Sequence, residues 1–439
     1  MPAPGGSCPY PTGREQDPVS NNDAPGATPA DPRVENTQDN SRPSPSAVRA
    51  RLAVSVHKLL YGTLVGAWAA RVPDIRATAG ANDATWGIAN SVDVATGLLM
   101  LFAIIAASGH VEGRYLVRGG AVIAVMVTPF AASAPNIQLL ILGLIIWACA
   151  SAQLEAPLRA LAMEVQRHYG RFLLGSFDAC FSFGAFAGAG AGIGTAAVGI
   201  TPGIQIGACS LVLGSLVAIT WTWLPTDTLR HEPKAGIVAT RRLRRRVTPQ
   251  LLLLTTLAVL LAFVTSAGEQ WAAIYTADGV GGGAAMGAAT YASWVLASAA
   301  GLLLVDRIVS RVDALGLLRV SLAPAALGLA IGLWLATPAA AVTGFAIMGL
   351  FMAAAGPVLV AIAGSQPGLT PAEGISIYQL GVSPGFLISP LLIGMLASAF
   401  GLRVGLSSVV LAFVIVVILS FWLRNPGDPV RHRQRGKRG

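Results

Sequence analysis

Residues 249–275 read PQLLLLTTLAVLLAFVTSAGEQWAAIY and decide the fold class of this chain. One charged side chain, Glu269, interrupts the run. A transmembrane helix needs about 20 mostly apolar residues to cross about 30 Å of hydrocarbon. A strand would instead show a short alternating pattern, so this continuous run predicts a membrane-spanning helix.

The same pattern recurs along the chain. Only 12% of its 439 residues are charged, against roughly 25% in soluble proteins. We expect twelve spans, near residues 51–71, 86–108, 115–134, 137–162, 171–197, 202–224, 249–275, 284–305, 313–336, 339–363, 373–398 and 402–423. The sequence therefore predicts an all-α polytopic membrane protein and excludes a soluble enzyme, a secreted disulfide scaffold and a disordered protein.

Polar stretches divide the chain into five parts. The first part is rich in Pro, Ser, Asn, Asp and Gly, which predicts a disordered tail. The longest polar interruption between spans carries seven basic residues. We expect a cytoplasmic tail over 1–48, an N-terminal six-helix bundle over 49–224, a basic cytoplasmic linker over 225–248, a C-terminal bundle over 249–424 and a basic cytoplasmic tail over 425–439.

Faint internal echoes suggest that the two bundles arose by duplication. Trp68-Ala-Ala recurs as Trp271-Ala-Ala, and the stretch from Ser176 has a partial counterpart from Ser376. Both offsets are about 200 residues, as two pseudo-symmetric six-helix units would give.

Small residues predict where helices pack. Gly184, Gly188 and Gly192 recur every four residues in the fifth span and predict a close helix contact. Pro384 and Pro390 predict a bent eleventh span whose freed carbonyls are satisfied by neighbouring helices.

The basic residues predict the orientation. If both termini are cytoplasmic, the outer loops receive only Arg71, Arg76 and Arg403 of the 30 Lys and Arg. So steep a bias favours a multi-pass protein of the cytoplasmic (inner) membrane with both termini inside. The net charge of +9 lies in loops and forms no binding face, so we expect no nucleic-acid partner.

Ionisable residues within the spans are the candidate functional groups. A charge at the bilayer centre costs about 2.5–3.5 kcal/mol on insertion scales, so such residues usually face the bundle interior. The candidates are His57, Lys58, Asp93, Glu155, Arg159, Asp178 and Glu269. Glu155 and Arg159 are four residues apart and can pair on one helix face. Four acids face two permanent cations, so we expect at least one acid to exchange protons near neutral pH.

Each candidate also has a structural interpretation. The Lys58 ammonium can extend to the cytoplasmic interface, and Glu155–Arg159 can be only a structural or gating salt bridge. Asp93 and Glu269 can be hydrated near the outer surface. His57 can be a packed neutral imidazole or a proton relay.

Two tryptophans near span ends have alternative interpretations. Trp68 and Trp271 can anchor the chain at the membrane interface. Alternatively, they can stack on a solute at the mouth of a cavity.

The sequence lacks nucleotide-binding machinery. It contains no Gly-x-x-x-x-Gly-Lys-Ser/Thr loop, and its four cysteines are not spaced for a metal. We therefore expect no enzymatic activity, no cofactor and no metal, with an ion gradient or the solute's own gradient as the energy source.

Four stretches resemble the major facilitator superfamily, and in particular its fucose permease-like bacterial branch. They are WAARVPDI (residues 68–75), GHVEGRYLVR (109–118), LEAPLR (154–159) and RFLLGSFDACFSFG (171–184). The second lacks the family's acid immediately before Arg114. Arg159 stands where the branch usually has Asn, and Asp178 where it often has a neutral or imidazole group.

The resemblance implies a cytoplasmic charge latch and a functional carboxyl. The gate residues would be Arg114 and Arg118, with Asp306 and Arg307 in the corresponding loop of the second half. Glu155 would be a proton- or substrate-linked carboxyl.

We therefore expect a monomeric secondary active transporter that moves a small organic solute by alternating access in the lipid bilayer, coupled to protons. Glu155 is the first-choice proton site, Arg159 its counter-ion and Asp178 the second carboxyl. One alternative is a proton-driven exporter of a moderately apolar metabolite or drug. A more remote one is a non-transporting scaffold or receptor whose tails recruit partners.

Overall fold

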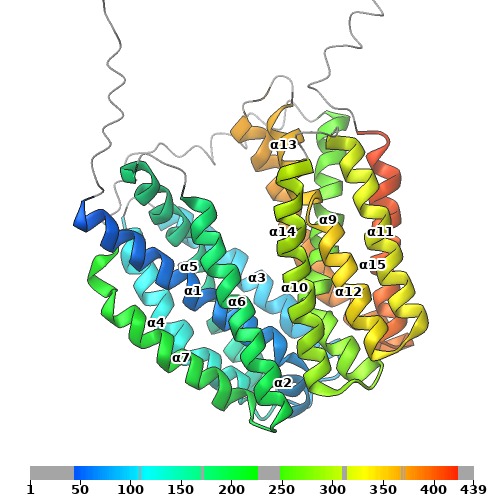
Figure 1. Ribbon diagram of the computed structural model, residues 1–439, viewed down its shortest axis with the longest axis horizontal. Coiled ribbons are helices and arrows are strands. Elements are labelled where there is room, and N and C mark those ends of the chain that lie inside the picture. Colours follow the sequence, from blue (N-terminus) through cyan, green and yellow to red (C-terminus); the bar gives the residue numbers. More distant parts are fainter. Residues whose placement is uncertain are drawn as a thin grey trace, which may run out of the picture. The chain divides into compact units, whose positions relative to one another are not determined.

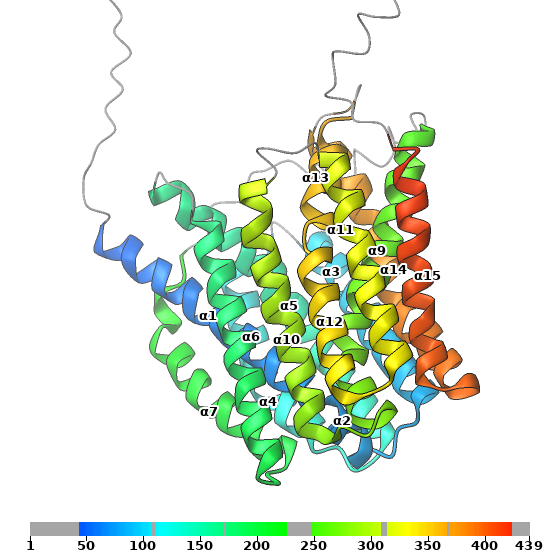
Figure 2. The ribbon, with the colours of Figure 1, turned by 45° about the vertical axis from the view of Figure 1, so that its right-hand side comes forward.

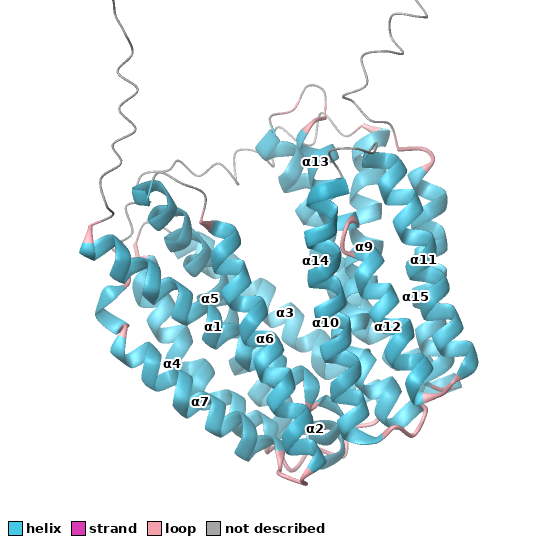
Figure 3. Cartoon of the chain, viewed as in Figure 1, coloured by secondary structure: helices cyan, strands magenta, loops and turns pink. Residues whose placement is uncertain are grey.

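A computed structural model describes residues 44–107, 110–169, 173–225, 248–308, 314–366, 369 and 371–423. Within these ranges the chain forms helices and short connections, with no strand (Figure 3). The predicted linker falls mostly outside the described residues. So do almost all of the predicted N-terminal tail and the whole of the predicted C-terminal tail.

Twelve helical stretches in the described part are long and apolar enough to cross a membrane. The helices are α1 (Pro45–Ala70), α2 (Val72–Thr78), α3 (Asp83–Ala107), α4 (Gly113–Ala132), α5 (Ile137–Tyr169), α6 (Leu174–Ala197), α7 (Pro202–Ile219), η1 (Trp221–Trp223), α9 (Pro249–Ile274), η3 (Tyr275–Gly279), α10 (Gly283–Ile308), α11 (Ala314–Leu335), α12 (Pro338–Met352), α13 (Ala355–Gly364), α14 (Pro371–Phe400) and α15 (Leu402–Ser420). These spans confirm the twelve predicted from the sequence.

Two helix ends differ from the prediction. The first helix begins at Pro45, inside the stretch predicted as tail, because Ser44 Oγ accepts a hydrogen bond from the Ala47 amide at 3.3 Å and proline suits the first helical turn. The fourth span continues to Tyr169, seven residues beyond its predicted end at 162. In this polar extension Glu164 pairs with Arg167 and His168, one turn along the helix.

Proline acts differently in two of the spans. The tenth span is broken into α12 and α13 at Ala353, because the ring of Pro357 clashes with the carbonyl four residues earlier. The eleventh span remains one helix, α14, through Pro384 and Pro390. Ser91 Oγ of α3 donates to the Leu387 carbonyl at 3.1 Å, one residue beyond the Phe386 carbonyl that Pro390 leaves without its helical donor.

Glycines allow α1 and α6 to pack backbone to backbone. A Cβ added to Gly184 would overlap the Leu59 carbonyl oxygen, and one added to Gly188 would overlap that of Thr63. The predicted close contact is therefore present. The corresponding pair α9 and α14 packs in the same way, with Gly385 against the Val259 carbonyl.

A second repeated contact shows that the two halves share one architecture. Arg118 of α4 donates to the Trp221 carbonyl at the end of the sixth span, at 3.1 and 2.7 Å, and lies over the indole ring. About 200 residues later, Arg319 of α11 donates to the Ser420 carbonyl at 2.7 Å and lies over the Phe421 ring. The halves are called here the N-terminal group (described residues 44–225) and the C-terminal group (described residues 248–423).

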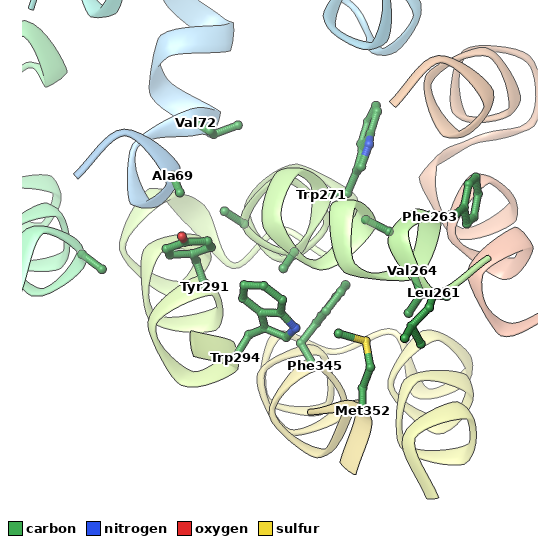
Figure 4. Close-up of a cluster of buried hydrophobic side chains, with 14 of the residues drawn as sticks. Ala69, Val72, Leu261, Phe263, Val264, Trp271, Tyr291, Trp294, Phe345 and Met352 are labelled. Carbon is green, nitrogen blue, oxygen red and sulfur yellow. The ribbon is translucent and has the colours of Figure 1, made fainter. Parts of the chain in front are cut away.

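The two groups meet along two helix pairs. Helix α3 packs on α14 and α6 packs on α10, as can be followed in Figures 1 and 2. Apolar side chains from both groups share one core near α2. Figure 4 shows Ala69 and Val72 of the first group beside Trp271, Tyr291 and Trp294 of the second.

Candidate functional site

A cluster of acids and tyrosines combines residues from both groups. Tyr61 of α1 interacts electrostatically with Glu155, Asp93 and Glu269. The carboxyl of Glu269 in turn interacts with Glu155 and with Tyr291 of α10. Five helices, namely α1, α3, α5, α9 and α10, therefore bring these side chains together.

Aromatic packing holds Tyr61 in place. Its ring lies 6.2 Å from the Trp147 ring of α5 and 5.5 Å from the Phe181 ring of α6, centroid to centroid. Both neighbours lie in the N-terminal group. The phenol ring is thus fixed on the N-terminal side while its hydroxyl reaches the acids.

Glu155 pairs with Arg159, as the spacing predicts. Arg159 Nη2 lies 3.7 Å from Glu155 Oε1, and the two side chains are 60% and 53% exposed. An exposed pair of this kind contributes little stability. Glu155 is therefore an acid with its own counter-ion.

Asp93 and Glu269 lack such a counter-ion among the described residues. Both are half-buried, and Asp93 Oδ1 is buried with no hydrogen-bond partner in that part of the chain. Asp93 does not fit the interpretation of an acid hydrated near the outer surface, because its Oδ1 atom is buried. Among the four acids that the sequence analysis singled out, these two are therefore the ones without a partner cation within the described ranges.

Lys58 and Asp178 form a pair that the sequence did not predict. Lys58 Nζ lies 3.3 Å from Asp178 Oδ1, with the lysine side chain only 6% exposed and the aspartate 67% exposed. The lysine does not extend to the interface, because its ammonium is held inside by this carboxylate. Asp178 was expected as the second proton carboxyl, but it carries a counter-ion of its own.

His57 lies outside the cluster. It is fully buried, and Nδ1 lies 2.8 Å from the Ala53 carbonyl oxygen, one turn earlier in α1. Nε2 has no hydrogen-bond partner among the described residues. These contacts are those of a packed imidazole and connect it to none of the acids.

The two tryptophans do not lie as expected for residues at the mouth of a cavity. Trp271 has no exposed surface and packs in the hydrophobic core (Figure 4). The stacking and interfacial interpretations of Trp271 are therefore wrong for this arrangement, because neither ring face is open. Trp68 is half-buried and packs against the same core.

The predicted gate arginines bind within the N-terminal group. Arg114 Nε lies 2.6 Å from Glu112 Oε2, so an acid two residues earlier replaces the missing one. Arg118 binds the Trp221 carbonyl. Asp306 and Arg307 lie at the end of α10, and their side chains fall outside the described part of the chain.

An ion bridge at the opposite end joins the two groups. Arg76 of α2 pairs with Asp83 at the start of α3, and its Nη1 lies 3.6 Å from Asp278 Oδ2 in the π-helical turn η3. The sequence analysis missed this bridge, because its members lie in short connections. It also missed Tyr61 and Tyr291, for which a hydroxyl within an apolar span was the available signal.

Among the described residues no group of three His, Cys, Asp or Glu could hold a metal ion.

Comparison with known proteins identifies the fold. No protein-family model matches the chain. The chain is 24% identical over 375 residues to the membrane protein MosC of Rhizobium meliloti, covering 84% of this chain and 88% of MosC. It is 28% identical over 378 residues to the uncharacterized transporter y4wD of Sinorhizobium fredii, covering 82% of this chain and 95% of y4wD.

Solved structures match over a similar share of the chain. The nucleoside transporter NupG covers 85% of this chain and 98% of its own, with a TM-score of 0.67 and 13% identity. The major facilitator superfamily transporter FucP, in an outward conformation, covers 86% of this chain and 99% of its own, with a TM-score of 0.59 and 12% identity. A D-xylose-proton symporter covers 87% of this chain and 98% of its own, with a TM-score of 0.66 and 12% identity. This chain is a polytopic membrane protein with the major facilitator fold.

Proposed function

We propose that the protein is a secondary active transporter that moves a small organic solute by alternating access and couples this movement to protons. The observation that carries the proposal is the cluster of Tyr61, Asp93, Glu155, Glu269 and Tyr291, built from both groups. The transporter names of its relatives and structural neighbours support the same class.

The arrangement of the cluster suggests how protons would couple. Asp93, Glu155 and Tyr61 belong to the N-terminal group, whereas Glu269 and Tyr291 belong to the C-terminal group. If the groups rock against one another, the surroundings of each acid change, and so does its tendency to hold a proton. Asp93 and Glu269 are better proton carriers than Asp178, because Lys58 already neutralises Asp178.

The described contacts between the groups support a state that is closed near α2. Arg76 bridges to Asp278 there, and Ser91 bonds to Leu387. The distribution of basic residues places the loops at this end outside the cell. A state closed at this end would therefore be open to the cytoplasm, where both termini would lie. We propose this topology in the inner membrane, and a monomer as the working unit.

Transport by purified protein in liposomes tests the proposal. Labelled nucleosides, sugars and amines are offered with and without a pH gradient. We expect the gradient to drive net movement of at least one solute in the wild type. Glu269→Gln and Asp93→Asn should abolish the response to the gradient while retaining counterflow exchange.

A matched control removes a different charge pair. The double variant Lys58→Gln with Asp178→Asn neutralises both partners of an ion pair, so no charge is left buried. It should keep the response to the pH gradient. Loss of that response in the control but not in Glu269→Gln would contradict the assignment of proton coupling to Asp93 and Glu269. Absence of net movement of every solute would contradict proton-coupled transport itself.

A further inference from the structure

We infer that one anionic phospholipid binds along α1 and α7 of the N-terminal group, with its phosphate on Arg49 beside Trp223 and an acyl chain in a groove between α1, α6 and α7. The two parts of this site lie at different depths in the membrane and rest on independent contacts. The inference concerns the lipid-facing side of the bundle and does not depend on which solute is moved.

The headgroup part of the site is an arginine held by an aromatic ring. Arg49 is exposed near the start of α1, and its Cζ atom lies 5.9 Å from the centroid of the Trp223 ring in η1. Among the described residues, no carboxylate or hydrogen-bond acceptor binds this guanidinium. The ring positions the guanidinium without neutralising its charge. Its N–H donors are therefore free for a phosphate, which arginine binds with two parallel hydrogen bonds.

A second arginine adds positive charge around η1. Arg118 of α4 donates to the Trp221 carbonyl at 2.7 Å, and its Cζ atom lies 5.5 Å from the centre of the Trp221 ring and 5.7 Å from that of Tyr115. None of these groups carries a negative charge. Arg49 and Arg118 thus contribute two positive charges that no acid in the described ranges pairs with, and this charge favours an anionic headgroup.

A groove of about 380 Å³ lies deeper along the same helices. Leu59 and Thr63 of α1, Phe183 of α6 and Val212 of α7 are among its lining residues. The Thr63 hydroxyl already donates to the Leu59 carbonyl at 2.9 Å, so it offers no free hydrogen to a ligand. Phe183 and Val212 are 67% and 64% exposed, so the groove opens away from the helix bundle. In a bilayer this opening faces acyl chains.

The spacing along α1 connects the groove with the arginine. Arg49, Val56, Leu59 and Thr63 follow one another at steps of seven, three and four residues, which places them on one helix face. Leu59 lies ten residues after Arg49, or about 15 Å along the axis. One leaflet contributes about half of the 30 Å hydrocarbon core. The groove therefore lies within reach of an acyl chain whose headgroup is at Arg49. Figure 2 shows α1, α6 and α7 together.

Only an anionic phospholipid accounts for both parts of the site. Free phosphate would use Arg49 and leave the groove unexplained, whereas an uncharged lipid would fill the groove and leave the guanidinium without an acceptor. Val48 and Leu52 near Arg49 are 48% and 49% exposed, as suits a surface against hydrocarbon. Under the proposed topology this end faces the cytoplasm, and the cytoplasmic leaflet is the one in which basic segments meet anionic lipids.

Native mass spectrometry of the full chain, purified in detergent, tests the inference. Dioleoylphosphatidylglycerol and dioleoylphosphatidylcholine have the same acyl chains and differ in net charge. We expect the first phosphatidylglycerol to bind about tenfold more tightly than the first phosphatidylcholine, the effect of one charge-assisted contact. Equal binding of the two lipids would overturn the inference. Displacement of phosphatidylglycerol by inorganic phosphate would also overturn it, by showing an anion site without a lipid.

A matched pair of arginine variants locates the headgroup. Arg51 lies two residues after Arg49, about 200° around the helix, and its Cζ atom lies 5.7 Å from the centre of the Tyr169 ring at the end of α5. Arg49→Gln should abolish the tenfold preference for phosphatidylglycerol and leave phosphatidylcholine binding unchanged. Arg51→Gln should keep the preference. An equal loss in both variants would indicate a general effect of positive charge and would contradict the assigned site.

A second pair of variants locates the acyl chain. Ala208 of α7 is exposed and lines the groove, so Ala208→Phe fills it without placing a bulky group in the core. Leu211 of the same helix is 72% exposed and is not among the lining residues. We expect Ala208→Phe to weaken the first molecule of both lipids several-fold, whereas Leu211→Phe should not. Unchanged binding of both lipids in Ala208→Phe would overturn the placement of the chain.

Discussion

At the scale of single residues, the decisive difference is between acids that have a cation and acids that do not. Glu155 has Arg159 and Asp178 has Lys58, whereas Asp93 and Glu269 face tyrosines and other acids. An acid beside a cation has its charge neutralised within the protein. Under the proposed function, Asp93 and Glu269 are therefore the acids on which proton coupling would depend.

Tyr291→Phe separates function from stability. The change removes a hydroxyl that bonds to nothing in the described part of the chain and keeps the buried ring. We expect the free energy of unfolding to change by less than about 0.5 kcal/mol. The response of transport to the pH gradient should weaken, because the hydroxyl that interacts with Glu269 is lost. Urea unfolding and liposome transport measure the two quantities. A large loss of stability with an unchanged response would show that the hydroxyl is structural.

Asp178→Asn tests the pair with Lys58. The change leaves a buried ammonium without its carboxylate, so we expect a loss of about 1–3 kcal/mol in stability. Adding Lys58→Gln removes the unpaired charge and should restore most of that loss. Thermal melting of the single and double variants checks this order. A double variant no more stable than Asp178→Asn would argue against the pair.

At the scale of helices, backbone contact decides which neighbours each span has. Helices α1 and α6 approach so closely that glycine is required at Gly184 and Gly188. The same arrangement recurs between α9 and α14. In a bilayer the lipid is as apolar as the side chains, so close packing takes the place of hydrophobic burial in joining helices.

Gly188→Ala and Gly190→Ala form a matched pair on one helix. A Cβ at Gly188 would overlap the Thr63 carbonyl, whereas one at Gly190 has no atom within 4 Å. We expect Gly188→Ala to cost about 1–3 kcal/mol through forced separation of the helices. Gly190→Ala should be neutral or stabilising by up to about 1 kcal/mol, since alanine favours helix. Equal melting temperatures for the two variants would contradict the described packing.

At the scale of the whole molecule, the connections near α2 tie the N-terminal and C-terminal groups together. Arg76 bonds to Asp83 within one group and to Asp278 of the other. Under the proposed alternating access, such a bridge would open when the site is exposed on the other side. Arg76 and Asp83 are only 12% and 16% exposed, whereas Asp278 is 47% exposed, so the bond to Asp278 is the more open of the two.

Asp278→Asn should shift the carrier towards the state that is open near α2. The substitution removes the cross-group partner of Arg76 and leaves Asp83 to hold the guanidinium. With spin labels at Thr78 and Val280, we expect a larger population of long distances in Asp278→Asn than in the wild type. An unchanged distance distribution would show that the bridge does not stabilise the closed state.

The sequence by itself determined the number and the approximate positions of the spans. Crossing a bilayer depends on local hydrophobic length, which each stretch carries within itself. The pair Glu155–Arg159 was predictable for the same reason, since both residues lie on one helix at a fixed spacing. The start of α1 and the break before Pro357 also depend on local sequence, namely a serine cap and a proline within the helix.

The tertiary structure alone decided which polar groups meet. Lys58 and Asp178 lie on different helices, and the cluster around Tyr61 draws on several more. A span that is apolar on every side does not encode which face turns inward. That rotation is set by the glycine contacts and aromatic packing between helices, so the burial of Trp271 and the bridge at Arg76 emerge only once the helices are packed.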